Sequence, residues 1–385
     1  MPNRRSSSRR TTSTSLLATI AVMACLGLAY LGQQVFSAAT GGGSAVPGDA
    51  TATAAGAANA TATPAMENWY QLYFTSPAYP DTAANRPARS VADPVIAGIA
   101  SARFTVDAAT YEFDLPAMTE ALIAAHKRGV TVRLVTDTDT MDQDSVHSVA
   151  AAGIPVVEDH KSAIMHDKFV IVDSAGVWIG SWNFTENDTY RNNNNLIGIA
   201  APEMVANYKA EFNEMFEQRE FGAGSPANTP YPQFTVSGAL IENYFSPDDG
   251  VARHILAAIQ SATRSIYFAA FAFTRDDFSQ ALIERAGAGV SVQGVYESRQ
   301  VAAGSDQSHN ALNGAGLPVL EDGNAYAMHH KFMIIDGSVV VTGSYNFTKA
   351  AEQSNDENVL IIHDPAIAAQ YLKEFAKVWR QAGGN

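Results

Sequence analysis

One pattern of histidine, lysine, aspartate, glycine, serine and asparagine occurs twice in the chain, 163 positions apart and with the same internal spacing. Both copies fit HxK(x)4D(x)6GSxN. A single HxK arises often by chance, whereas six fixed positions matched twice do not. We therefore interpret the doubled pattern as the functional centre. Its members are His166, Lys168, Asp173, Gly180, Ser181 and Asn183 in the first copy, and His329, Lys331, Asp336, Gly343, Ser344 and Asn346 in the second.

The spacing predicts how these side chains are presented. The apolar runs 169–172 and 332–335 indicate buried strands. Residues i and i+2 share one face of a strand, so the histidine and the lysine of each copy point the same way. Asp167 and His330 fall on the opposite face, and we interpret His330 as a bystander. The turn after each motif aspartate predicts a hairpin that returns Gly-Ser-x-Asn beside the histidine and lysine, a set suited to holding a phosphate.

Two kinds of motif residue have a structural interpretation as well. Asp173 and Asp336 each follow an apolar strand and precede a turn, so we expect them mainly to cap that turn, although they belong to the catalytic pattern. For Ser181 and Ser344 two roles stay open, a hydrogen bond to a bound phosphate or one to a neighbouring backbone group.

This doubled pattern resembles that of the phospholipase D superfamily, the HKD phosphodiesterases, and the resemblance extends from about Tyr70 to the C-terminus. It implies an α/β fold of two pseudo-twofold-related domains, each a mixed β-sheet flanked by helices, that share one active site within a monomer. It also implies that one histidine attacks phosphorus and forms a phosphohistidine, while the other protonates the leaving alcohol. The lysines and asparagines would hold the phosphate, with no metal and no other cofactor.

The roles of the two histidines are predicted from a further position. In relatives, a polar residue eleven positions after the motif asparagine orients the histidine of the opposite half. Those positions hold Asn194 and Glu357. A carboxylate stabilises a cationic imidazole, so crossed pairing would place Glu357 behind His166 as the nucleophile and leave His329 as the acid. Asn194 joins the two motif serines as a candidate for substrate binding.

The repeat extends beyond the motifs. The segment 153–159, GIPVVED, matches 316–322, GLPVLED, and the offset grows from 160 to 163 across a short insertion. Strand-like and helix-like segments alternate, which indicates an α/β architecture. In the second half we expect strands over 266–273 and 290–296 and helices over 277–286, 307–314 and 366–382. The predicted domains are 67–219 and 234–385, joined by a linker over 220–233.

The N-terminus is typical of an exported protein. Residues 1–38 combine arginines with an apolar run, as in a signal peptide or an N-terminal membrane anchor. An Ala/Thr/Gly-rich linker follows over 39–66. The only cysteine, Cys25, lies in the apolar run, so no disulfide is expected in the remainder. We therefore predict an extracytoplasmic protein, either secreted or anchored by this segment.

Charge and composition leave two enzyme classes open. Without its first 38 residues the chain has 21 basic and 39 acidic residues, a net charge of −18. Such a charge disfavours non-specific attraction to nucleic acid or to anionic membranes. We expect hydrolysis of phospholipid headgroups at a membrane surface, with transphosphatidylation as a further outcome. The remaining histidines show no metal-ligand spacing.

The alternative is an exported, metal-independent endonuclease acting on DNA or RNA. Segments 266–274 and 344–349 resemble the single-copy endonucleases of the same superfamily. Four cations are candidates for a modest basic rim, namely Lys161, Arg191, Arg299 and Lys349. A non-catalytic envelope binding module is the third possibility, and the two complete motifs argue against it.

Overall fold

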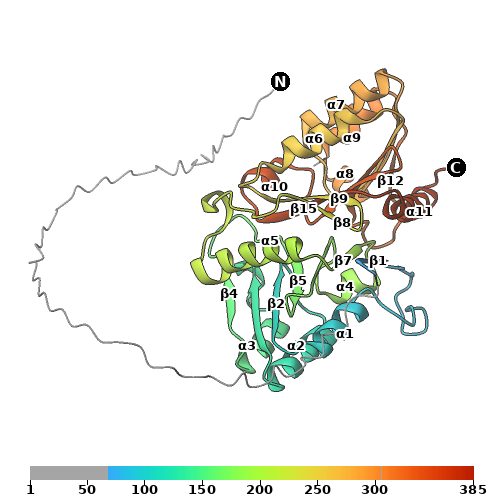
Figure 1. The fold of residues 1–385 in the computed structure, drawn as a ribbon. Coiled ribbons are helices and arrows are strands. Elements are labelled where there is room, and N and C mark those ends of the chain that lie inside the picture. The colour runs from blue at the N-terminus through green and yellow to red at the C-terminus, as the bar shows by residue number, and fades with distance from the viewer. Residues whose placement is uncertain (1–67, 305) are drawn as a thin grey trace, which may run out of the picture. The chain divides into compact units, whose positions relative to one another are not determined.

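A computed structural model describes residues 68–304 and 306–385. The predicted signal or anchor at 1–38 and the linker at 39–66 lie outside these residues. Two α/β halves follow, each built on one mixed sheet with helices against it (Figure 1). The fold class expected from the sequence is therefore confirmed. In the described part of the chain no helix is both long and apolar enough to span a bilayer.

The first half contains a seven-stranded sheet in the order β1-β7-β6-β5-β2-β3-β4. Strands β2, β3 and β4 run parallel, and β5, β6, β7 and β1 pair antiparallel. The strands are β1 Tyr70–Phe74, β2 Thr105–Thr110, β3 Thr131–Thr136, β4 Val156–Glu158, β5 Lys168–Val172, β6 Gly176–Gly180 and β7 Asn195–Ile199. The helices are α1 Asp93–Ser101, α2 Pro116–Lys127, η1 Thr138–Thr140, α3 Asp144–Ala151, α4 Glu186–Tyr190, α5 Pro202–Asn213 and the π-turn η2 Glu214–Gln218.

The second half repeats this plan in an eight-stranded sheet of order β12-β11-β10-β13-β14-β15-β9-β8. Its strands are β8 Gln233–Val236, β9 Ala239–Ser246, β10 Ser265–Ala270, β11 Ser291–Tyr296, β12 Val319–Glu321, β13 Lys331–Ile335, β14 Val339–Gly343 and β15 Glu357–His363. Its helices are α6 Val251–Ser261, α7 Asp276–Gly287, α8 Ser298–Ala302, α9 Gln307–Gly314, α10 Lys349–Gln353 and α11 Pro365–Gln381.

The predicted elements of the second half match these bounds closely, with one informative difference. The expected strand over 266–273 ends at Ala270, because the chain leaves the sheet there and Phe273 forms an isolated bridge with Phe347. The three extra residues of this half fall between β11 and α9, where α8 takes the place of the shorter η1. The predicted linker over 220–233 contains a 3-10 turn, η3 Gly222–Gly224, and its last residue begins β8.

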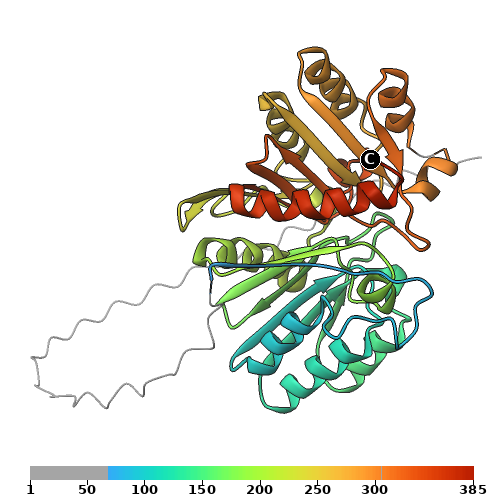
Figure 2. The ribbon, with the colours of Figure 1, turned by 90° about the vertical axis from the view of Figure 1, so that its right-hand side faces the viewer.

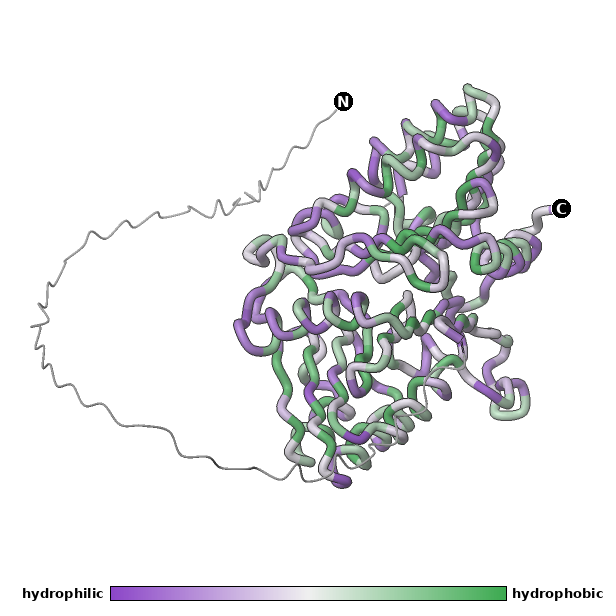
Figure 3. The backbone as a smooth tube through the Cα atoms, viewed as in Figure 1, coloured by the Kyte–Doolittle hydropathy of each residue, from purple (hydrophilic) through white to green (hydrophobic). Residues whose placement is uncertain are grey.

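The motif strands are buried on both faces, which explains their continuous apolar sequence. On β5, Phe169 and Ile171 face the second half, whereas Val170 and Val172 pack in the cluster that contains residues of α1 and α2. Figure 3 shows mostly hydrophobic residues along the interior strands and hydrophilic segments toward the outer helices. The strand alternation therefore places one face of each motif strand in the contact between the halves.

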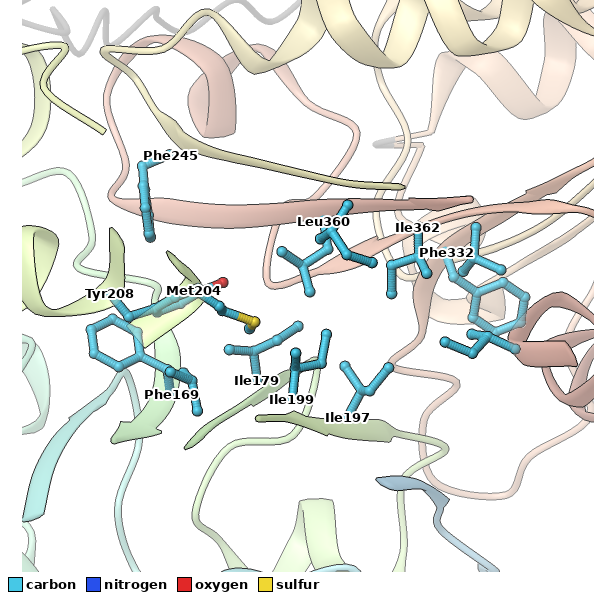
Figure 4. Close-up of a cluster of buried hydrophobic side chains, with 14 of the residues drawn as sticks. Phe169, Ile179, Ile197, Ile199, Met204, Tyr208, Phe245, Phe332, Leu360 and Ile362 are labelled. Carbon is cyan, nitrogen blue, oxygen red and sulfur yellow. The ribbon is translucent and has the colours of Figure 1, made fainter. Parts of the chain in front are cut away.

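That contact is a single hydrophobic core shared by the two sheets (Figure 4). Phe169, Ile179 and Met204 of the first half lie opposite Leu360 and Ile362 of the second. Helix α5 packs on β5 and β6, and α11 packs on β10 and β14, so both helices lie on the inward faces of their sheets. Figure 2 shows α11 along the side of the second half that faces the first. This core holds the two motifs in a fixed relation.

Candidate active site

The two motif histidines are anchored to the opposite half by backbone pairing. Just before His166, Met165 forms a parallel bridge with Asp356, and Met328 forms the equivalent bridge with Asn193. The His166 backbone N–H donates to the Asp356 carbonyl at 2.9 Å. The His329 N–H donates to the Asn193 carbonyl at 3.0 Å. Each histidine therefore sits beside the residue that follows its bridging partner, Glu357 or Asn194.

Behind His166 lies the carboxylate of Glu357, with 2.7 Å between Nδ1 and Oε2. Both side chains are buried. Burial, together with the charges of Lys168 and Lys331, lowers the pKa of His166 well below its usual range. Burial raises the pKa of Glu357 to about 8, although Lys168 opposes that rise. The structure thus brings together the pair expected from the sequence, and the free His166 imidazole is neutral.

The surroundings of His329 differ in chemistry. Its Nδ1 lies 2.9 Å from Oδ1 of Asn194 and 3.4 Å from Oδ2 of Asp188. Burial and the charge of Lys331 lower the pKa of His329 to about 4, against the effect of Asp188. Although burial opposes it, the charge and hydrogen bond of His329 hold the pKa of Asp188 well below its usual range. His329 therefore has a neutral amide as its nearer partner.

Asp188 is the site residue that the sequence analysis missed. It also binds the backbone N–H of Asn183 at 2.8 Å and the Asn192 side chain at 2.6 Å, so it fixes a motif asparagine as well as a histidine. The position 163 residues later is Ala351. The sequence signal that could have identified Asp188 is this difference between the repeats, a carboxylate in the first and a methyl group in the second.

Each of the two lysines is buried and bonded to the backbone of the histidine of its own motif. Lys168 Nζ donates to the His166 carbonyl at 2.8 Å, and Lys331 Nζ donates to the His329 carbonyl at 3.0 Å. Burial lowers the pKa of Lys168 to about 8. Burial and the neighbouring Lys168 lower the pKa of Lys331 to about 7. Two buried ammonium groups that destabilise each other are suited to an anion, since a bound phosphate restores the charged form of both.

The motif asparagines have free carboxamides. Within the described residues neither Asn183 nor Asn346 makes a side-chain hydrogen bond, and the Oδ1 atom of each is buried without a partner. Aromatic rings complete the two sides of the site. Tyr111 lies 5.5 Å from the His166 ring, and Phe271 lies 4.6 Å from the His329 ring, measured between centroids. Imidazole, ammonium and carboxamide groups are therefore available to one phosphate.

The serines and Asn194 act from behind the histidines. Ser181 Oγ donates to Asn194 Oδ1 at 2.8 Å, and Ser344 Oγ accepts the Asn358 N–H at 3.0 Å. All three candidates for substrate binding are fully buried. In the empty site Ser181, Ser344 and Asn194 position the groups that hold the histidines, which favours the structural role, and their contact with substrate stays a prediction.

Asp173 and Asp336 lie away from this site. The Asp173 carboxylate accepts the backbone N–H groups of residues 103–105, just before β2, at 2.7 to 2.9 Å. Asp336 accepts the equivalent groups of residues 263–265 at 2.7 to 2.9 Å. Seven residues of extended chain separate each from its histidine, roughly 20 Å. Their place in the catalytic pattern is corrected, because their carboxylates bind the loop that enters the neighbouring strand, far from the phosphate site.

The residues on the opposite strand face lie between the halves, as expected. His330 Nδ1 is 3.4 Å from Oδ1 of Asn195 in the first half, and Asp167 Oδ1 accepts from Asn358 Nδ2 in the second half at 2.6 Å. Burial raises the pKa of Asp167 to about 7. These groups connect the halves without entering the phosphate site.

Two of the four cations proposed as a basic rim are neutralised. Lys161 forms an ion pair with the buried Asp356, and Arg191 pairs with Asp81 at 2.8 Å. Arg299 donates to the Ala325 carbonyl at 3.0 Å, and Lys349 is exposed at the start of α10. The rim is therefore weaker than the sequence alone indicated.

Glycine is required at the two glycine positions of the motif because a larger residue would not fit there. A Cβ on Gly180 would lie 2.1 Å from the Asn195 carbonyl oxygen, and one on Gly343 would lie 2.1 Å from that of Asn358. The strand that carries Ser181 must therefore approach the strand after Asn194 more closely than any side chain permits. Among the described residues no three His, Cys, Asp or Glu side chains gather as a metal site.

Comparison with known proteins agrees with this geometry. A family model described as "Cardiolipin synthase, PLD-like domain" matches residues 95–216 and again 255–379. The mitochondrial cardiolipin hydrolase of Chlamydomonas reinhardtii is 30% identical over 209 residues, which cover 48% of this chain and 92% of that protein. The phospholipase D of Rickettsia felis is 30% identical over 164 residues, which cover 43% and 82%.

The crystal structure of phosphatidylserine synthase from Haemophilus influenzae has a similar fold, with a TM-score of 0.57 and 10% identity over 75% of this chain and 83% of that one. The two matches of the family model cover most of the chain, one in each half and each with its own complete motif. The chain therefore belongs to the phospholipase D superfamily.

Proposed function

We propose that this phospholipase D-type phosphodiesterase hydrolyses phospholipids through a phosphohistidine on His166, with His329 as the general acid and base. The observation that carries the assignment is the crossed pairing, in which His166 has a carboxylate at 2.7 Å and His329 has an amide at 2.9 Å. The charge of an attacking imidazole grows as its N–P bond forms, and a carboxylate behind Nδ1 stabilises that charge.

The reaction follows from these positions. Lys168, Lys331 and the two motif asparagines bind the non-bridging oxygens of the phosphodiester. His166 Nε2 donates its lone pair to phosphorus, and the P–O bond to the leaving alcohol breaks as His329 gives that oxygen a proton. His329 then takes a proton from water, whose oxygen attacks phosphorus and breaks the N–P bond. An acceptor alcohol in place of water gives transphosphatidylation.

The low pKa of His329 in the free protein is compatible with its role as an acid. Its burial among lysines disfavours the cation when the site is empty. A bound phosphodiester places a negative charge beside the imidazole, and that charge raises the pKa of His329. Substrate binding therefore favours the protonated form of His329, which can give the leaving group the proton that it needs.

Lipid is the substrate class that the observations support. The named relatives are a cardiolipin hydrolase and a phospholipase D. A chain that has a net charge of −18 without its first 38 residues, and two neutralised rim cations, has little general attraction for a polyanion. The likeness of two segments to single-copy endonucleases keeps an exported nuclease as the alternative. We further propose a monomer that acts extracytoplasmically at a membrane surface, on the basis of its two motifs and its N-terminal segment.

The histidine assignment is tested by trapping the intermediate in the full chain. Bis(p-nitrophenyl) phosphate has a leaving group that needs no acid. His329→Ala should therefore still form a phosphoenzyme and release one equivalent of p-nitrophenolate, whereas His166→Ala should release none. His147→Ala, an exposed histidine on α3, serves as the control and should turn over normally. A phosphoryl group recovered on His329 would reverse the assignment.

The substrate class is tested in parallel. The wild-type chain is incubated without added metal with phosphatidylcholine vesicles and with single-stranded DNA. Release of choline and formation of phosphatidate support the proposal. Efficient DNA cleavage with no hydrolysis of any phospholipid would make the nuclease the correct function.

A further inference from the structure

One carboxylate at the edge of the phosphate site has no part in the mechanism above. Glu112 follows β2 and is the next residue after Tyr111, whose ring lies 5.5 Å from the His166 ring and 5.6 Å from Lys168 Nζ. Its carbonyl accepts the backbone N–H of Phe184, the residue after Asn183, at 3.2 Å. The Glu112 side chain is half-buried, and the charges of Asp188 and Lys168 both act on its pKa. The backbone thus ties Glu112 to the motif asparagine.

The Glu112 carboxylate lacks a partner. Across residues 68–304 and 306–385 it accepts no hydrogen bond and joins no ion pair, unlike the other carboxylates of the site, Glu357 and Asp188. Burial, then the charges of Asp188 and Asp114, raise the pKa of Glu112, and only Lys168 opposes them. The ionised form of a half-buried, unpaired carboxylate is unfavourable in the empty site. A bound cation would stabilise that ionised form.

The fold itself does not require this carboxylate. Thr110 pairs with Lys168 in the first half as Ala270 pairs with Lys331 in the second. The two residues that follow each strand are therefore equivalent. They are Tyr111 and Glu112 in the first half, and Phe271 and Ala272 in the second. The second half forms the same turn with alanine, so the charge of Glu112 serves something other than folding.

We propose that Glu112, together with the ring of Tyr111, determines headgroup specificity by binding the ammonium group of an amine-bearing phosphodiester of the ethanolamine or choline class. In such headgroups two carbons separate the ester oxygen from the nitrogen, so the ammonium lies beside the phosphate that Lys168 holds. A carboxylate and an aromatic face are the groups that bind ammonium ions in proteins. The same carboxylate repels the adjoining phosphates of a nucleic acid strand. This inference rests on the proposed phospholipid activity.

The test compares two lipids that share acyl chains and differ only in the headgroup. Phosphatidylethanolamine and phosphatidylglycerol are each dispersed at the same low mole fraction in neutral detergent micelles, and kcat and KM are measured with the full chain. In the wild type the ratio of kcat/KM should favour phosphatidylethanolamine. In Glu112→Gln, which keeps the size and removes the charge, that ratio should fall about tenfold, as expected for one partly desolvated ammonium contact, and mostly through KM.

Two further variants complete the test. Glu120→Gln removes an exposed carboxylate from α2 and should keep the wild-type ratio. Glu112→Asp keeps the charge and should retain a preference for phosphatidylethanolamine, which separates loss of charge from loss of packing. An unchanged ratio in Glu112→Gln, or an equal decrease for both lipids, would overturn the inference. A wild-type chain that cleaves DNA and neither lipid would instead refute the proposed function, before any variant is compared.

Discussion

Replacing Glu357 by glutamine removes a group that can become negatively charged behind His166, while keeping the shape of the side chain. The Glu357 carboxylate lies 2.7 Å from Nδ1 in a buried setting, so it stabilises the imidazolium that forms as Nε2 bonds to phosphorus. A hydrogen bond to a charged group is worth about 1.5 to 3 kcal/mol. At about 1.4 kcal/mol for each factor of ten, the variant should form the phosphoenzyme about 10 to 160 times more slowly.

The assay must report the first chemical step alone. Stopped-flow release of p-nitrophenolate from bis(p-nitrophenyl) phosphate does so, because this leaving group departs without a proton. Glu357→Gln should slow the burst, whereas Glu321→Gln, an exposed carboxylate at the end of β12, should not. If the burst in Glu357→Gln has the wild-type rate and only the later hydrolysis is slowed, Glu357 assists a general base, and His166 is not the nucleophile.

The same substitution should make the protein more stable relative to wild type as the pH rises. Burial raises the pKa of Glu357 from 4.5 to about 8, so folding favours its protonated form. Its contribution to stability is complete below about pH 4.5 and is lost as the pH rises through 8, with a slope of at most about 1.4 kcal/mol per pH unit. Glu357→Gln has no such loss, so its Tm relative to wild type should increase between pH 5 and 8.5. Parallel Tm profiles would show that Glu357 is already ionised across that range.

Three other outcomes follow from the site and the charge of the chain. Steady-state hydrolysis of bis(p-nitrophenyl) phosphate should survive excess EDTA, and a loss restored by a divalent ion would refute the phosphohistidine route. Gly180→Ala places a Cβ 2.1 Å from the Asn195 carbonyl oxygen and should cost about 1 to 3 kcal/mol, seen as a lower Tm, whereas Gly287→Ala meets open space and should not destabilise the protein. Any DNA cleavage should fall steeply as salt rises from low to physiological concentration, while hydrolysis of phosphatidylcholine should change far less, and salt-insensitive DNA cleavage would favour the nuclease.

The sequence predicted the elements and the shared phosphate groups because those depend on local patterns. Continuous apolar runs followed by turn residues predicted the motif hairpins, and the helix expected over 307–314 has those bounds in the structure. The proximity of Glu357 and His166 was predictable from a fixed spacing and a crossed repeat. The two side chains meet because each residue directly follows a member of the Met165–Asp356 bridge between the halves.

The rest depended on contacts between positions that no local pattern relates. Asp188 reaches His329 across the interface between the halves, and Asp173 binds backbone seventy residues earlier in the chain. The pairing of Lys161 with Asp356 spans 195 residues and removes a cation that the sequence left free. The sequence could not show that Ser181 is buried. In the structure its hydroxyl group donates to Asn194, which lies behind His329.

A duplicated motif would give two equivalent histidines if their surroundings were also duplicated. The histidine, lysine and asparagine positions are identical in both repeats, and they serve the one phosphate that the halves share. Three nearby carboxylates, Glu357, Asp188 and Glu112, are each present in one repeat and absent from the other. Glu357 occupies the position in the second repeat that Asn194 occupies in the first, and on this difference we base the proposed assignment of nucleophile and acid.

The same reasoning assigns the two remaining carboxylates. Asp188 corresponds to Ala351 and Glu112 corresponds to Ala272, so the first half alone adds negative charge at the edge of the site. Asp188 is bonded to a histidine and to the motif asparagine, and it is therefore used within the protein. The charges of Asp188 and Lys168 act on Glu112, but in the described part of the chain its carboxylate makes no hydrogen bond and no ion pair. A charge that neither the fold nor the chemistry uses is left for the substrate, and an anionic site with one unpaired carboxylate beside it selects a phosphodiester that carries its own cation.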